Sequence, residues 1–96
     1  VHEAMPGHYL QLAHSNRYPS TLRALHSSGV FIEGWAVYAE RMMIEQGYLG
    51  GNLLMELTVR KWYLRGIANA IMDQGIHAGE MSRVEAMELM TEATFQ

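Results

Sequence analysis

The sequence contains no cysteine, which excludes a disulfide framework and any zinc site built from thiolates. Basic residues are also few, since seven Lys and Arg stand against ten Asp and Glu and the net charge is -3. Proteins that bind nucleic acid carry a basic footprint, so we expect no nucleic-acid partner. Long apolar runs are missing as well, because Glu, Arg or Gly interrupts each stretch before the roughly 18 residues of a membrane span. We therefore expect neither nucleic-acid binding nor a membrane span in this region.

Length and composition are those of one small folded region. The 96 residues are 49% hydrophobic and 18% charged, which is typical of a globular chain. The sequence begins inside a motif, at Val1-His2-Glu3, and ends at Thr94-Phe95-Gln96 without a stop signal for a last helix. We expect residues 1–96 to be a C-terminal-side fragment of a larger catalytic domain, whose upstream part completes the site. A signal peptide would also lie upstream, so cytoplasm and cell envelope both stay open.

The helix-start and helix-stop residues predict an all-α fold of about four helices, with no convincing strand. Ser20 follows Pro19 and gives a start signal for a short helix, which Ser27-Ser28-Gly29 is expected to close. A second helix is expected to begin near Val30, with Gly47 as its left-handed stop.

Two further helices are expected in the second half of the chain. A long one would be capped by Asn52 and run to about Gln74, with Gly75 as its stop. The run Ser82-Arg83-Val84-Glu85 has the S-x-x-E form of a capping box and would open a last helix through Met90. The eight methionines are expected to fill core positions, and an adaptable binding surface is the alternative.

The run His2-Glu3-Ala4-Met5-Pro6-Gly7-His8 is the most informative in the sequence. It lies in a segment of helix formers from Val1 to about His14. In the zinc-peptidase pattern H-E-x-x-H, histidines at i and i+4 chelate one zinc ion. The glutamate beside the first histidine activates the water on the metal. Here the second histidine falls at i+6, about 120° from the first on a regular helix.

The two additional residues are Pro6 and Gly7, and they suggest how the motif still works. Proline cannot donate the helical backbone bond and disfavours α geometry in the residue before it, while glycine adopts conformations that other residues avoid. The run therefore reads as H-E-x-x-H with a two-residue bulge, which is expected to rotate His8 back towards His2. A satisfied core or surface histidine is the alternative, and this run alone does not decide between the two.

Glu33 is the candidate for a third ligand. It lies in the run Phe31-Ile32-Glu33-Gly34-Trp35-Ala36, where apolar neighbours make an unpaired charge costly. Glu40 follows seven residues later, about 20° away around a helix, so both carboxylates share one face. Glu40 is expected to fix the tautomer of a ligand histidine through its second nitrogen, or else to be solvated or paired with Arg41. Two histidines, one glutamate and an open fourth position make a catalytic zinc site.

Three motifs taken together closely resemble a large bacterial family catalogued as domain of unknown function 885. They are H-E-A-M-P-G-H-Y-L-Q, E-G-W-A-V-Y-A-E and D-Q-G-I-H-A. The second also resembles a stretch of gluzincin-type aminopeptidases whose first glutamate binds zinc. The family is mostly helical and is regarded as related to gluzincin-like zinc peptidases. The resemblance therefore implies zinc at His2, His8 and Glu33, with Glu3 as general base, although Gln74 departs from the family's pattern.

His77 is a further catalytic candidate, because it follows the expected stop at Gly75 and would project from a turn. In related peptidases a His or Tyr from a separate element stabilises the oxyanion of the intermediate. A capping or surface histidine is the alternative. Weaker candidates, for orienting the substrate or supporting the ligands, are Glu40, Tyr38 and Arg65.

These residues together predict a zinc-dependent hydrolase that acts on a peptide substrate. Glu3 would take a proton from the activated water and pass it to the leaving amine. One alternative is a helical domain that is inactive, or whose zinc is structural, and that binds peptides; a structural site would fill all four positions with protein groups. Another is a zinc amidase or esterase. Substrate preference, exo- or endopeptidase action and oligomeric state stay open.

Overall fold

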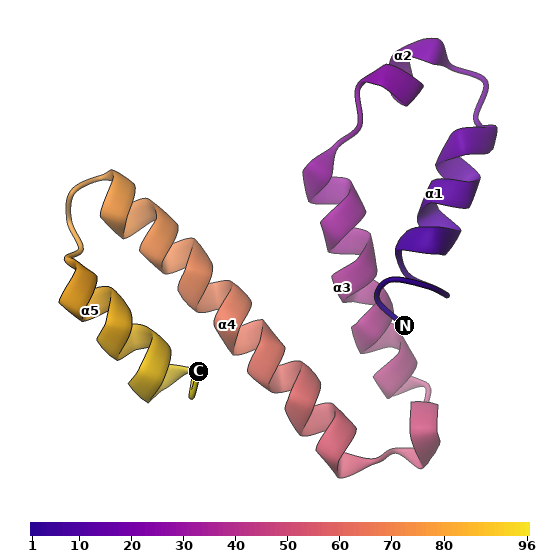
Figure 1. Cartoon of the computed structure of the whole chain (residues 1–96). Helices are drawn as coiled ribbons and strands as arrows, with labels where there is room; N and C mark the ends of the chain where they lie inside the picture. The colour runs from indigo at the N-terminus through magenta and orange to yellow at the C-terminus, as the bar shows by residue number, and fades with distance from the viewer. The chain divides into compact units, whose positions relative to one another are not determined.

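The computed structural model describes all residues from Val1 to Gln96 and is all-α, as predicted, with five α-helices and no strand. The helices are α1 (His8–Arg17), α2 (Thr21–Leu25), α3 (Gly29–Glu45), α4 (Leu53–His77) and α5 (Arg83–Glu88) (Figure 1). A 3-10 turn covers Tyr48–Gly50 and a π-helical turn covers Leu89–Ala93. The chain divides into two compact units, Val1–Asn52 and Leu53–Gln96. None of the helices combines the length and apolar character that crossing a membrane requires.

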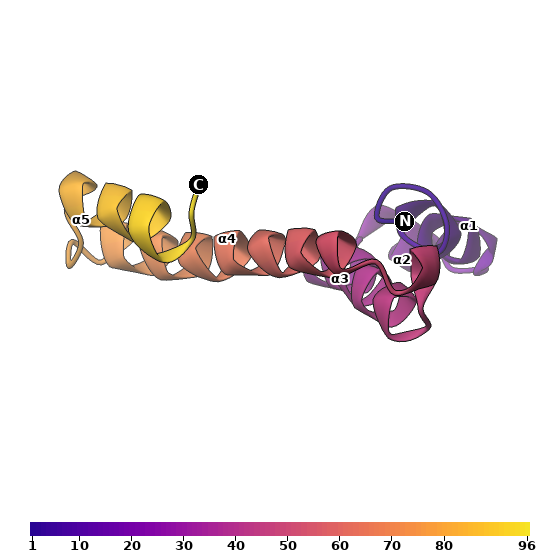
Figure 2. The same cartoon turned by 90° about the horizontal axis from the view of Figure 1, so that it is seen from below.

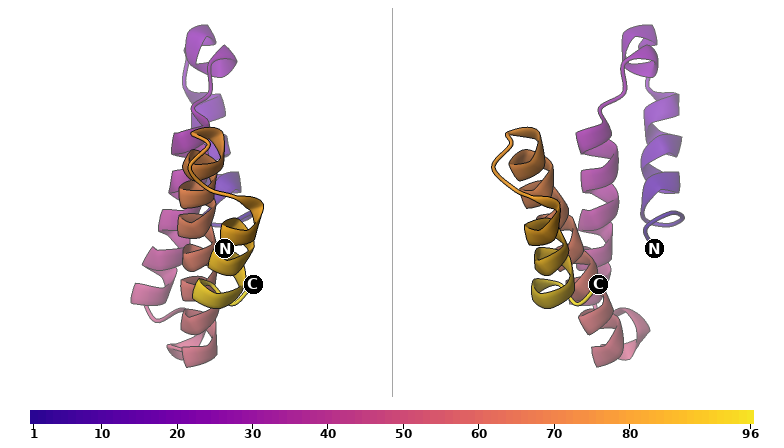
Figure 3. Two further views of the ribbon diagram at one scale, coloured as in Figure 1. Left: turned by 90° about the vertical axis from the view of Figure 1, so that its left-hand side faces the viewer. Right: turned by 60° about the vertical axis from the view of Figure 1, so that its left-hand side comes forward.

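In the first unit, α1 and α3 lie side by side, and α2 lies in the connection between them (Figure 3). On α3, Ala36 and Ala39 have no exposed surface. On α1, Gln11 is the buried residue. Two alanines one helical turn apart let another element approach closely, because they leave no long side chain between the backbones. This close approach brings the carboxylates of α3 near α1.

Serine hydroxyls begin both α2 and α3. Ser20 Oγ accepts a hydrogen bond from Arg23 N, and Ser28 Oγ accepts one from Phe31 N, each at 3.3 Å. The start signal at Ser20 is therefore confirmed. The predicted end of the short helix before Ser27 is confirmed, since α2 ends at Leu25, and the Ser28 hydroxyl pairs with one of the first free amides of the next helix. At the other end of α3, Gly47 takes the predicted left-handed conformation, with φ 75°.

The first segment differs from its prediction at both ends. No helix forms before Pro6, and α1 begins at His8 and continues to Arg17, beyond the expected end near His14. The Met5-Pro6 peptide bond is cis. A proline in this position removes a backbone donor, which is why helix formers on its N-terminal side do not add a turn to α1.

In the second unit, α5 folds back along α4 (Figure 2). The predicted stop at Gly75 is wrong, since α4 passes through it to His77 and Gly79 takes the left-handed conformation, with φ 74°. Gly75 has a different use. The backbone amides of Glu80 and Met81 donate to its carbonyl at 2.8 and 3.0 Å, and a Cβ there would lie 2.9 Å from the Met81 Cβ. The glycine thus permits a close approach of the returning chain.

The capping box predicted at Ser82 is confirmed. Ser82 Oγ accepts from Glu85 N at 3.3 Å, and the Glu85 carboxylate accepts from Ser82 N and Ser82 Oγ, each at 2.7 Å. The hydrogen bonds from the Ser82 backbone and side chain lower the pKa of the Glu85 carboxyl below its usual 4.5. The α-helix that opens here ends at Glu88, two residues before the expected end at Met90, and gives way to the π-helical turn.

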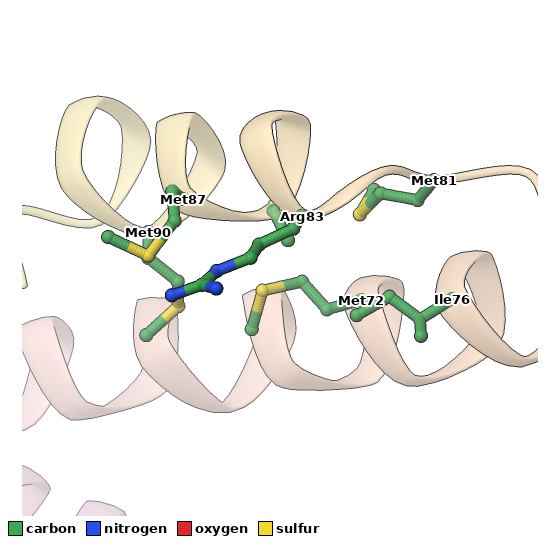
Figure 4. A pocket seen from close by; sticks show the side chains of 7 residues that line it. Met72, Ile76, Met81, Arg83, Met87 and Met90 are labelled. Atoms are coloured by element: carbon green, nitrogen blue, oxygen red, sulfur yellow. The ribbon is translucent and has the colours of Figure 1, made fainter.

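Methionines gather between α4 and α5, where a groove is lined chiefly by Met side chains and crossed by Arg83 (Figure 4). The residues that line it are Met72, Ile76, Met81, Arg83, Ala86, Met87 and Met90. None of the eight methionines of the chain is fully buried. The prediction that they fill a core is therefore wrong for these two units, and half of them line an open groove instead.

Candidate metal centre

Residues 1–7 form a wide turn that continues the hydrogen bonding of α1. The amide of His8 donates to the His2 carbonyl at 2.8 Å, and that of Tyr9 donates to the Glu3 carbonyl at 3.1 Å. Each bond reaches back six residues, where an α-helix reaches back four. The widened turn holds the two additional residues of the motif. His8 is therefore placed relative to His2 much as the second histidine of H-E-x-x-H is on a regular helix.

Gly7 is the residue that makes the wide turn possible. A Cβ at this position would lie 1.7 Å from the His2 carbonyl oxygen and 2.4 Å from that of Val1. Both contacts are with backbone atoms, which cannot move aside as the end of a flexible side chain can. The Gly7 amide itself donates to the Val1 carbonyl at 3.1 Å. The bulge inferred from the sequence is therefore present and depends on glycine at its last position.

Trp35 of α3 fastens the wide turn to α3. Its indole Nε1 donates to the Pro6 carbonyl at 2.8 Å, in a partly buried position. Tyr38 contributes to the same cluster, since its ring centre lies 5.8 Å from that of Trp35 at a tilt of 48°. This contact was not predicted from the sequence. The available signal was an indole N–H in an apolar run, because a buried Trp N–H normally finds an acceptor.

Replacing Trp35 by Phe is expected to loosen the wide turn, because the Pro6 carbonyl loses its donor while the aromatic ring is kept. The lost hydrogen bond predicts a destabilisation of about 0.5–1.5 kcal/mol. Hydrogen exchange should accelerate at the amides of His8 and Tyr9. Trp62→Phe on α4 is the matched control, since the Trp62 side chain is exposed. Equal effects of the two substitutions on those amides would contradict the role given to the indole N–H.

The imidazoles of His2 and His8 meet edge to face, with ring centres 4.8 Å apart and planes at 84°. Their Nε2 atoms lie 3.9 Å and 3.6 Å from Oε2 of Glu33 on α3. Two ligands of one tetrahedral zinc ion, each about 2.1 Å from it, lie about 3.4 Å apart. The two distances to Glu33 are slightly wider than this spacing, so the Glu33 carboxylate lies within reach of both imidazoles.

Glu40 contacts the other nitrogen of His2, with Nδ1 and Oε1 2.7 Å apart. Because an ionised carboxylate only accepts hydrogen bonds, Nδ1 carries the hydrogen, and in the neutral ring Nε2 keeps a free lone pair. The alternative partner, Arg41, pairs with Glu45 at 2.8 Å. Glu33 and Glu40 therefore project from one face of α3, as their spacing predicted. Glu33 lies near Nε2 of His2, and Glu40 contacts Nδ1 of the same ring.

Glu3 is exposed, and one of its carboxylate oxygens belongs to a cluster with one nitrogen each of His2 and His8, all within 4.8 Å of one another. Two carboxylates therefore border the pair of histidines. Glu33 has contacts of 3.6 and 3.9 Å to the Nε2 atoms, and its side chain is 69% exposed. Glu33 thus reaches both rings from α3, whereas Glu3 is the residue that follows His2 in the sequence.

Two predicted site residues, His77 and Arg65, belong to the second unit. His77 is the last residue of α4, and its Nδ1 donates to the Asp73 carbonyl at 2.6 Å. The expectation that it projects from a loop is wrong, because the helix does not stop at Gly75. The Arg65 guanidinium lies 5.2 Å from the ring centre of Trp62. The functional roles of His77 and Arg65 stay predictions.

Comparison with known protein families matched residues 1–96 to a family described as bacterial protein of unknown function (DUF885). No curated protein and no solved structure was found to match the chain. The matched residues include the wide turn, the α3 carboxylates and the whole second unit.

Proposed function

The chain belongs to this family of bacterial proteins of unknown function, and we propose that it is a zinc-dependent hydrolase that cleaves peptide bonds. One observation carries the proposal: the Nε2 atoms of His2 and His8 face the Glu33 carboxylate at 3.9 and 3.6 Å. A site of this kind needs segments distant in sequence to converge, and here the wide turn and α3 do so.

The residues present fit a zinc ion. Two imidazole nitrogens and a carboxylate oxygen are the donor set of several catalytic zinc sites, which leave a fourth position for water or substrate. The Glu40 contact to His2 Nδ1 is the kind of support that metal-ligating histidines almost always have. A closed structural site would bury its ligands, whereas the Glu33 side chain is 69% exposed and Glu3 is exposed as well. Exposure of both carboxylates supports a site that a substrate can reach.

Each residue then has a defined role in the proposed reaction. When bound, zinc lowers the pKa of a coordinated water towards neutrality and polarises a substrate carbonyl. His2, His8 and Glu33 hold the ion, and Glu40 keeps the hydrogen of His2 on Nδ1. The Glu3 carboxylate accepts the proton of the attacking water and delivers it to the leaving amine nitrogen. His77 remains the predicted donor to the oxyanion.

Metal removal tests the proposal directly. The full-length protein is expected to contain zinc and to cleave members of a peptide library. A chelator should abolish cleavage, and added zinc should restore it. His8→Ala should lose the metal, whereas His14→Ala, which changes an exposed histidine of the same helix, should keep it. Cleavage that survives removal of the metal would refute the proposal, and cleavage of ester or non-peptide amide substrates alone would replace it by the esterase or amidase alternative.

A further inference from the structure

Two buried side-chain polar atoms in the chain lack a hydrogen-bond partner, and both belong to α1. They are Nδ1 of His8 and Oε1 of Gln11. Buried polar groups in folded proteins are nearly always paired, so each unpaired atom calls for an explanation. That both occur on one helix, beside the candidate metal centre, indicates a common cause.

The two atoms are complementary in their hydrogen-bonding roles. His8 Nε2 faces the Glu33 carboxylate at 3.6 Å, and a neutral imidazole that offers Nε2 to a metal carries its hydrogen on Nδ1. Gln11 Nε2 donates to Ser15 Oγ at 2.6 Å, which leaves Oε1 as an acceptor. One atom therefore needs an acceptor and the other needs a donor.

Their positions allow them to meet. His8 and Gln11 are three residues apart in α1, and side chains at this spacing are neighbours on a helix surface. Gln11 is only 7% exposed, so bulk solvent does not satisfy its carbonyl oxygen. A rotation of the Gln11 amide, or one water between the two atoms, would pair them.

We propose that Gln11 is a positioning residue of the metal centre. Its Oε1 accepts the Nδ1 hydrogen of His8, directly or through one water, and thereby holds His8 Nε2 towards the ion. The inference rests on the proposed function, and it gives His8 the support that Glu40 gives His2. Each ligand histidine then has its own acceptor, a carboxylate from α3 for one and an amide from α1 for the other.

Zinc affinity measured by competition with a chelating dye tests this role in the full-length protein. Gln11→Met keeps the length of the side chain but has no oxygen, and it should weaken zinc binding about 10- to 100-fold. Gln11→Glu presents an acceptor at both terminal positions and should bind zinc at least as tightly as the wild type. Gln74→Met makes the same change at an exposed glutamine of α4 and should have no effect.

The tautomer of His8 in the metal-free protein provides a second measurement, by ¹⁵N NMR of the imidazole. The wild type should carry the hydrogen on Nδ1, and Gln11→Met should shift the population towards Nε2. Wild-type affinity in Gln11→Met, or equal losses in Gln11→Met and Gln11→Glu, would overturn the inference. If the wild type bound no zinc, the proposed function would fail, while an unchanged tautomer in Gln11→Met would separately overturn the role of Gln11.

Discussion

Glu3→Gln is expected to lower peptide hydrolysis by about 100- to 10,000-fold, the usual contribution of a general base. Glutamine has the size and shape of glutamate but cannot take up the proton of the attacking water. Glu3 is exposed and its side chain belongs to no ion pair, so the substitution should leave the fold intact. Zinc content should also remain at the wild-type level, because His2, His8 and Glu33 supply the ligands.

Glu33→Gln is the informative companion, because Glu3 and Glu33 both border the two histidines. We expect it to weaken zinc binding, whereas Glu3→Gln should affect catalysis alone. Glu80→Gln changes an exposed carboxylate in the turn after α4 and serves as the control. If Glu3→Gln lost zinc and Glu33→Gln kept it, the assignments of base and ligand would be exchanged. Full activity in Glu3→Gln would remove Glu3 from the mechanism.

The shared face of Glu33 and Glu40 could be predicted because helical periodicity depends on backbone geometry alone. Seven residues make nearly two turns, so both side chains had to project together once α3 formed. Which of the two histidines Glu40 would contact was beyond such reasoning, because it depends on how the wide turn lies against α3. The distance of 2.7 Å between Glu40 and His2 is a product of that packing.

The turn itself was predictable only in outline. Proline and glycine indicate a break in the helix, but the bonds that reach back six residues arise from carbonyls that the sequence does not single out. The hydrogen bond from Trp35 to the Pro6 carbonyl joins residues that are 29 positions apart, and no local sequence pattern predicts such a pair. At Gly75 a helix stop was predicted that the structure does not have, because a glycine can mark either a helix end or a close approach of two chain segments. Its contact with Met81 is what distinguishes the two uses.

Gly7→Ala should be the most damaging single-methyl change in the first unit. Its Cβ would lie 1.7 Å from the His2 carbonyl oxygen, far inside any allowed contact, and His2 is itself a proposed ligand. The turn must open to relieve the clash, and His2 then moves away from His8 and Glu33. Overpacking of this kind costs about 1–3 kcal/mol. Loss of a hydrogen bond that supports a ligand histidine lowers metal affinity roughly 10- to 100-fold. Gly7→Ala displaces a ligand itself, so we expect zinc affinity to fall by at least this factor.

Gly66→Ala separates this local clash from the general effect of replacing glycine. Gly66 lies within α4, and a Cβ there meets no atom within 4 Å. Alanine in a helix interior is favoured over glycine by about 0.5–1 kcal/mol, so this variant should unfold at a slightly higher temperature and bind zinc normally. Thermal unfolding and chelator competition on both variants provide the measurements. If Gly7→Ala bound zinc as tightly as the wild type, the motif would tolerate a side chain where the backbone leaves no room. The wide turn would then not be what holds His2 in place.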